Sequence, residues 1–345
     1  MEQLARRVFP VVKYKEKDIS QDISPYLLSM TVIDNLEGEL DSVRISLLNE
    51  DNKFLNPKWS PNKDEILEIG IKTLNWESEI EGYQYRKLGI YYVDEKNFNK
   101  KIATWKGISS PLNSRNQKNS KTWALISLKR LGEEFSSKYG LEFQYYVSEE
   151  ITLMDLRQEN ETDFSFLDRI AKEEGVKLKI TNKKMVLFSE KEFQNKKIAW
   201  IIDLTKVIDY SIKDISNDIY DAVEINEFDP IALKNKKVIK TKAELEGKTG
   251  GTKNKVLKVK ARSKSNDLNR YCLKMLEQVN KKEKSLTITM VGDRNIYAGL
   301  TFNLINAGIY TGKYMAKKVK HTLPKFTTEI EAYLISEEQG EKRND

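Results

Sequence analysis

The chain has 345 residues, of which 39% are hydrophobic and 32% charged, with a formal net charge of +7. This composition favours two or three small domains over one deep core. One cysteine, Cys272, and one histidine, His321, exclude an intrachain disulfide and a zinc site built from histidine and cysteine. No apolar run approaches 18 residues and the N-terminus has no secretory h-region, so no membrane association is predicted.

Residues 1–112 have the pattern of an antiparallel β domain. Short apolar or alternating runs at 26–33, 43–47, 66–74, 87–93 and 102–108 are separated by polar turn residues. This spacing predicts a small barrel or sandwich. Trp59, Trp76 and Trp105 are expected to anchor its core rather than to bind a sugar or a base.

Residues 113–196 are predicted to form a small α+β domain. Thr122 is a plausible cap for a helix containing Trp123, Ile126, Leu131 and Phe135, which recur at near-helical spacing. A strand at 141–145 and a short helix at 151–157 are expected next. A strand at 185–188 should then pair antiparallel with one at 176–180.

The stretch 161–180 is the most regular part of the sequence. Thr162 or Asp163 can cap a helix, and an apolar stripe, Phe164, Leu167, Ile170 and Ala171, follows. Gly175 suits a left-handed helix end, and Glu173 and Glu174 are expected to be its solvated last turn. In the following strand Lys177 and Lys179 alternate with apolar residues, which predicts one buried and one solvated face.

Residues 197–335 return to a β pattern. Strands are predicted at 207–212, 220–225, 286–290, 301–305, 314–321 and 326–334, with a helix whose apolar face includes Leu268, Cys272 and Val279. The lysine-rich segment 230–262 is interpreted as a long, mobile loop excursion, and 336–345 as a charged, disordered tail. The predicted fold class is therefore α+β and β-rich, with two antiparallel β-barrel domains flanking a small α+β domain.

Nothing in the sequence indicates catalysis. The segment Gly247-Lys248-Thr249 lacks the first glycine of a phosphate-binding loop, since Lys242 occupies that position. The adjacent glutamates Glu133–Glu134, Glu149–Glu150 and Glu173–Glu174 should point apart rather than converge. We expect Cys272 in a core and His321 at a surface or interface. No catalytic, cofactor-binding or metal-binding residue is predicted, and a β-rich structural or interaction protein is favoured.

One pattern resembles a known family. The stretch 161–176 resembles the signature of the phage late control protein D family, which is itself similar to the hub portion of type VI secretion spike proteins. The matching residues are Asp163, Phe164, Leu167, Ala171, Glu173, Glu174 and Gly175. The C-terminal part is similar to the family's later strands and turns, at Gly292, Asp293, Gly299 and Gly312-Lys313-Tyr314. Residues 26–51 resemble hub proteins of Gram-positive contractile phages and phage-tail-like bacteriocins.

The resemblance implies a structural baseplate hub without a cofactor. Three copies, each with two related tube-like β-barrel domains, would form a ring that adapts a six-fold tail tube to a three-fold central spike. The implied partners are two further copies, the tail tube protein, the spike protein and other baseplate proteins, with neither a membrane nor a specific nucleic acid. The implied location is the tail baseplate of a virion or bacteriocin particle, after synthesis in the host cytoplasm.

Two alternatives from other classes stay open. A tail-associated cell-wall hydrolase would need convergent acids or an activated His321. A DNA-binding protein is suggested only by the basic composition, because the lysine-rich segment lacks interleaved aromatic residues. The chain also shows no needle repeats and no lysozyme-like insert, so we expect spike and wall-cutting activities on separate chains.

Overall fold

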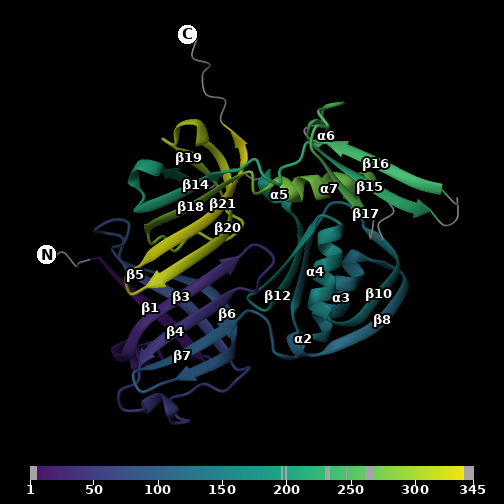
Figure 1. Ribbon diagram of the computed structural model, residues 1–345. Coiled ribbons are helices and arrows are strands. Elements are labelled where there is room, and N and C mark those ends of the chain that lie inside the picture. The colour runs from purple at the N-terminus through teal and green to yellow at the C-terminus, as the bar shows by residue number, and fades with distance from the viewer. Residues whose placement is uncertain are drawn as a thin grey trace, which may run out of the picture.

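The computed structural model describes residues 6–195, 197–198, 200–229, 234–245, 247–260 and 268–337. Strands dominate, and most of them belong to one large sheet, which contains strands from both the N-terminal and the C-terminal part of the chain (Figure 1). Two smaller units, one mixed and one built on a three-stranded sheet, lie beside it.

The first half of the large sheet comes from the N-terminal part of the chain. Its strands are β1 (Arg7–Tyr14), β2 (Lys17–Asp18), β3 (Leu27–Asn35), β4 (Ser42–Leu48), β5 (Ile66–Leu74), β6 (Tyr83–Phe98) and β7 (Ile102–Ile108). Short helical turns connect them at α1 (Ser20–Ile23), η1 (Ser24–Tyr26) and η2 (Lys53–Leu55). The pairing is antiparallel throughout. Alternating residues such as Val43, Ile45 and Leu47 point into a core that also holds Trp105 and Phe54.

The second half comes from the C-terminal part. It contains β13 (Trp200–Asp203), β14 (Asp209–Asp214), β18 (Lys284–Val291), β19 (Thr301–Ile305), β20 (Gly312–Leu323) and β21 (Thr327–Glu337), with turns η3 (Leu204–Lys206) and η4 (Gly308–Tyr310). These strands enclose a separate core around Ile288, Phe302, Tyr314 and Ile330. The halves join where β3 pairs antiparallel with β20, from Met30 opposite Leu323 to Asn35 opposite Lys318.

The two halves have the same strand order. In space the first half runs β3-β4-β7-β6-β5-β1, and the second runs β14-β18-β21-β20-β19-β13. Numbered along the chain within each half, and leaving out the two-residue β2, both orders read second, third, sixth, fifth, fourth, first. All the corresponding pairs are antiparallel, except that β13 lies parallel to β19. The large sheet is therefore built from two topological repeats.

The mixed unit is inserted between these repeats. It consists of β8 (Lys118–Ser127), α3 (Leu128–Lys138), β9 (Glu142–Tyr146), β10 (Thr152–Thr162), α4 (Asp163–Glu173), β11 (Val176–Thr181), β12 (Lys184–Ser189) and α5 (Glu190–Gln194), preceded by α2 (Asn113–Asn116). Strands β8 and β10 form a two-stranded ribbon, and β11-β12-β9 form a small sheet. Apolar faces of α3 and α4 meet both sheets in one core.

A third unit is inserted in the second repeat between β14 and β18. It contains β15 (Ala222–Asp229), β16 (Lys234–Thr241), α6 (Lys242–Leu245), β17 (Val256–Lys260) and α7 (Leu268–Asn280). Helix α7 covers one face of the sheet β16-β15-β17 through a core that includes Val223, Ile225, Cys272 and Leu276. Figure 1 shows this unit projecting at the upper right, away from the large sheet.

Two predicted helices are wrong in the mixed unit. The helix expected from Thr122 begins only at Leu128, and the residues before it form β8; the helix expected at 151–157 is strand β10. The two strands pair with each other, but Asp155 has a positive φ of 48°. The backbone turns there, so that Leu153 and Leu156 both face the core. This three-residue spacing imitates a helical period.

Two predictions about the C-terminal region also need correction. The lysine-rich segment was expected to be a loop, yet its described residues include β16, α6 and β17; residues 230–233, 246, 261 and 262 lie outside the described chain. Strand β21 extends to Glu337, two residues into the expected tail, and 338–345 are not described. The other predicted strands and helices are confirmed within a few residues. Closed barrels are not confirmed, because no hydrogen-bonded ladder among the described residues closes either half.

Candidate functional site

A buried ionic junction connects the large sheet to the mixed unit. Lys179 of β11 reaches out of the mixed unit, and its Nζ lies 2.5 Å from Asp34 Oδ1 and 3.0 Å from Asp41 Oδ1. It also donates to the carbonyl of Asn35. Asp34 Oδ2 accepts a further hydrogen bond of 2.9 Å from Ala298 N in the second half. The carboxylate of Asp34 thus contacts all three parts of the chain that meet here.

A second group of charges continues the junction toward α7. Lys177 is 3% exposed and forms ion pairs with Glu37 and Glu190, and its Nζ donates to Gln278 Oε1 at 2.8 Å. Glu190 also accepts from Lys281 and from the Tyr333 hydroxyl. We refer to Asp34, Glu37, Asp41, Lys177, Lys179, Glu190, Lys281 and Tyr333 as the junction cluster.

The electrostatics of this cluster follow from its burial. Burial raises the pKa of Asp41 to about 6; nearby Lys179 opposes the shift and Asp34 adds to it. Burial disfavours the charge of Lys179, but Asp34 and Asp41 outweigh it and raise the Lys179 pKa. Burial likewise opposes ionisation of Glu190, yet Lys281 and Lys177 lower its pKa overall. Paired buried charges of this kind fix one arrangement, since each is costly without its partner.

The two halves of the sheet are also tied by side chains beside the β3–β20 ladder. Trp76 Nε1 donates to Gly292 O at 2.6 Å, and the Trp76 ring lies 5.2 Å from that of Phe326. The guanidinium of Arg294 forms an ion pair with Glu81 at 2.5 Å and donates to Thr73 Oγ1 at 3.1 Å. Loops of the first and second halves therefore hold each other directly.

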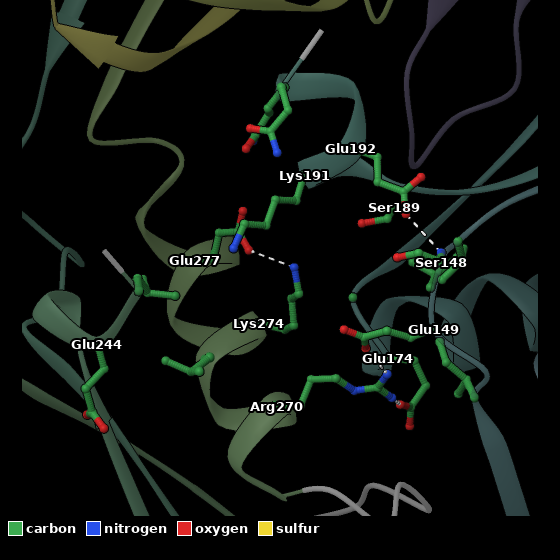
Figure 2. A pocket seen from close by; sticks show the side chains of 18 residues that line it. Ser148, Glu149, Glu174, Ser189, Lys191, Glu192, Glu244, Arg270, Lys274 and Glu277 are labelled. Carbon is green, nitrogen blue, oxygen red and sulfur yellow. Dashed lines mark hydrogen bonds and ion pairs between the residues drawn. The ribbon is translucent and has the colours of Figure 1, made fainter. Parts of the chain in front are cut away.

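A cleft of about 500 Å³ separates the mixed unit from α7. Figure 2 shows Arg270 extending from α7 toward Glu149 and Glu174, and Lys274 turned toward Glu277. Arg270 Nη1 lies 3.0 Å from Glu149 Oε2, and its Nη2 pairs with Glu174. The two carboxylates converge on one guanidinium, so each of them is paired with Arg270.

The structure places the first group of family-signature residues around α4. Asp163 begins the helix and is 1% exposed; its carboxylate accepts from Asn119, Lys138, Tyr139 and Gln158. Burial opposes its ionisation, but these hydrogen bonds outweigh it, that of Lys138 first, and lower its pKa. Phe164, Leu167 and Ala171 face the core of the mixed unit.

The end of α4 differs from expectation in one respect. Glu173 lies within 3.7 Å of Arg169, as expected for a helix surface. Glu174, expected to be solvated, is 4% exposed and pairs with Arg270. Gly175 has a φ of +70°, and the side chain of Lys274 occupies the space where a Cβ would stand. The end of α4 is thus a contact with α7.

The second group of signature residues lies between β18 and β19. The Phe326 ring packs against Gly292 where a Cβ would be, and Asp293 accepts from Asn295 N at 2.9 Å in a tight turn. Gly299 has a φ of +95° and donates to Ala316 O at 2.8 Å. This turn contacts the junction cluster through Ala298, whereas the first group lies along α4 and at its end. The structure does not bring the two groups together.

Two single residues singled out by the sequence are buried. Cys272 is fully buried in the core beneath α7, as expected. His321, expected at a surface or interface, is 2% exposed within the chain. Its Nδ1 lies 3.0 Å from Thr328 Oγ1 and its Nε2 3.1 Å from Ile296 O. Burial lowers the His321 pKa to about 4.

Sequence reasoning missed the junction cluster. The available signal was the presence of Lys177 and Lys179 in an otherwise apolar strand, which alternation assigns to solvent. Among the described residues, no group of three histidine, cysteine or carboxylate side chains is placed to hold a metal ion. Nor does any helix in the described ranges have the length and apolarity needed to cross a membrane.

The comparisons with known proteins bear on the fold. No protein-family model matches the sequence, and neither does any curated protein. Among solved structures, a tail protein from Neisseria meningitidis superposes with a TM-score of 0.70 at 11% identity, covering 95% of this chain and 97% of the other. The 43 kDa tail protein of prophage MuSo2 from Shewanella oneidensis gives 0.69 at 12% identity, covering 95% and 98%.

A third similar structure comes from a secretion system. The E. coli c3393 protein, a component of the type VI secretion system, gives a TM-score of 0.57 at 9% identity, covering 90% of this chain and 74% of the other. The chain therefore has the fold of phage tail proteins, which it shares with a type VI secretion component. The resemblance drawn from the sequence is confirmed at the level of the fold.

Proposed function

We propose that the chain is a non-enzymatic hub of a contractile tail baseplate. Three copies form a ring that binds the six-fold tail tube on one side and the three-fold spike on the other. In this proposal residues 1–112 and 197–335 are the two tube-like domains, and 113–196 is a domain between them. Other baseplate proteins contact its outside, and the particle is a phage or a phage-tail-like bacteriocin.

The observation that carries the proposal is the repeated strand order. A ring of three identical chains has three-fold symmetry, but one with two equivalent sheets per chain presents six similar surfaces. Two topological repeats joined by one continuous ladder supply that arrangement within a single polypeptide. The similar solved structures support a tail role, since two of them are tail proteins.

The junction cluster supports a structural role. An adaptor has to hold its two repeats and the inserted units in a fixed relation, and buried ion pairs specify one geometry at the cost of desolvation. The convergent glutamates of the α7 cleft are already bound by Arg270. This pairing favours the structural role over the hydrolase alternative, which would need one of these two acids free to transfer a proton.

The test is stoichiometry in an assembled complex. The chain is co-expressed with the tail tube and spike proteins of the same particle, and the mass of the purified complex is measured. We expect three copies of this chain per spike trimer. A stable monomer that binds neither tube nor spike would contradict the proposal. A murein zymogram run on the same sample should be blank, and clearing abolished by Glu174→Gln would instead support the hydrolase.

A further inference from the structure

The two repeats differ in what covers one of their edges. In the first repeat β3 pairs with β4 on one side and with β20 on the other. Its counterpart in the second repeat, β14, pairs with β18 alone among the described strands. The counterpart of β20 is β6, whose residues after Val93 pair with β7 but no longer with β5. Among the described strands, two edges of the chain therefore have no partner strand: the outer edge of β14, and the edge of β6 at residues 95–98.

The two repeats can be aligned residue by residue. Both fifth strands contain a Gly-x-Tyr motif, Gly89-Ile90-Tyr91 within β6 and Gly312-Lys313-Tyr314 at the start of β20, and both tyrosines are buried. Each strand then has a register shift, between Val93 and Glu95 and between Ala316 and Lys318. Counting from these points makes Phe98 of the first repeat equivalent to His321 of the second, and Lys96 equivalent to Val319. Following the neighbouring ladders from β6 and β20 makes Ile45 in β4 equivalent to Ile288 in β18. In the same way Val32 in β3 is equivalent to Ile212 in β14.

We propose that β14 of one copy adds, antiparallel, to residues 95–98 of β6 in the next copy. The contact between copies thereby repeats the β3–β20 ladder found within each copy. This inference rests on the proposed ring and names the strands that close it. The equivalence places Ile212 opposite Phe98, where Val32 faces His321, and Asp214 opposite Lys96, where Asp34 faces Val319.

Side-chain exposure differs between β3, which has β20 beside it, and β14, which has no described strand on that side. Met30 in β3 is fully buried, whereas Tyr210, at the equivalent place in β14, is 53% exposed. An apolar pair of Ile212 with Phe98 and an opposite-charge pair of Asp214 with Lys96 suit a cross-strand contact. An unprotected strand edge of this kind is a template for pairing with another chain.

The backbone groups have the required direction. Ile215 N donates to Glu283 O, so every second residue of β14 counted from Ile215 directs its N–H toward β18. Ile212 belongs to the other set, and its N–H therefore points to the edge of β14 that has no described partner strand. The bond from Leu36 N to Lys317 O fixes the β3–β20 ladder in the same way, with Val32 directed at β20. Equivalent residues thus direct their N–H groups alike, toward β20 in one case and toward solvent in the other.

The contact is head-to-tail, because β14 and the end of β6 are different surfaces of the same chain. Such contacts form a ring when the rotation closes and a filament when it does not. The internal β3–β20 contact sets the rotation between the repeats. If the same contact also joins one copy to the next, the rotation from each repeat to its neighbour is the same all around the ring. Three chains then supply six equivalent repeats.

The test is a disulfide placed across the proposed ladder. Lys213 and Asn97 are both exposed, and the equivalence makes them a non-hydrogen-bonded pair, like Ile33 and Lys320. The Cα atoms of such a pair lie about 4.5 Å apart, within disulfide range. We expect the Lys213→Cys/Asn97→Cys variant, oxidised in the complex with tube and spike, to run as covalent dimers and trimers on a denaturing gel. The native Cys272 is buried and does not compete.

The controls separate register from proximity. Lys213→Cys paired with Glu95→Cys is one diagonal step off the proposed register and should cross-link at least ten-fold less. A charge reversal, Asp214→Lys, should weaken assembly, and adding Lys96→Asp should restore it. A three-copy complex without cross-links and without charge rescue would overturn the inference and leave the proposed ring standing. Absence of any three-copy complex would overturn both.

Discussion

Lys179 in β11 and Asp34 in β3 form an ion pair of 2.5 Å across the boundary between the mixed unit and the large sheet. Asp34 also accepts from Ala298 N, so one carboxylate connects three segments that are far apart in sequence. Lys179 is itself shared with Asp41. These two side chains therefore couple the mixed unit to both halves of the large sheet.

Removing the shared cation should be strongly destabilising. Lys179→Met keeps the length and apolar volume of the side chain but leaves Asp34 and Asp41 without their ammonium partner. Loss of one partner from a buried ionic group costs about 3–5 kcal/mol. Denaturant unfolding measures the change. Lys184→Met, which removes the exposed pair with Glu142, is the matched control and should cost less than about 1 kcal/mol.

Asp41 should make a contribution to stability that falls with rising pH. Its pKa is raised to about 6 in the folded chain, against about 3.9 when unfolded. Between these values the folded state binds the extra proton, so stability decreases from pH 4 to pH 6 and is then constant. Asp41→Asn removes this dependence. The difference in unfolding free energy between wild type and variant should change by about 2–3 kcal/mol between pH 4 and pH 7. An unchanged difference would refute the raised pKa of Asp41 in the folded chain.

His321 should act in the opposite direction over nearly the same range. Burial lowers its pKa to about 4, from about 6.5 when unfolded. The unfolded chain then binds more protons, so stability is complete above pH 6.5 and is lost as the pH falls toward 4. In wild type the slopes of Asp41 and His321 largely cancel. His321→Gln should expose the falling Asp41 slope, measured by unfolding at pH 4, 5, 6 and 7, and a flat profile would contradict the assignment.

The parts of the fold that the sequence predicted are those where local pattern and burial agree. Helix α4 has a cap at Thr162, whose hydroxyl accepts from Ser165 N, an apolar stripe and a glycine end. The strands of the large sheet alternate cleanly, as at Val43, Ile45 and Leu47. Each of these signals lies within one segment, so a single segment was enough to predict the element.

The local turn at Asp155 misled the helix prediction at 151–157, and the other main failures come from contacts between distant segments. Lys177 and Lys179 look solvated because alternation assigns charges to water, but acids from β3, the turn after it and α5 bury them. Glu174 looks like a helix end until Arg270 of α7 covers it. The repeated strand order has little counterpart in sequence beyond the Gly-x-Tyr motifs within β6 and at the start of β20. The repeat lies in the order in which the strands of each half pair with one another.

The contact between the mixed unit and α7 can be tested at Gly175. This residue has a φ of +70°, and Lys274 fills the space beside its Cα. Gly175→Ala should therefore pay a left-handed backbone cost of about 1–2 kcal/mol and also displace α7. Gly140→Ala is the matched control, because Gly140 has a similar φ of +64° with no neighbouring atom around its Cβ position. Unfolding measurements should show a larger loss for Gly175→Ala.

The cause of that excess is separated by a double variant. Lys274→Ala empties the space beside Gly175, so Gly175→Ala in that background should cost no more than Gly140→Ala does. Hydrogen exchange of the α7 amides should rise in Gly175→Ala and return toward wild type in the double variant, since the displaced helix can settle back. If both alanine variants lose the same stability and α7 exchanges at its normal rate, the close approach of Lys274 contributes nothing, and Gly175 is needed only for its backbone angle.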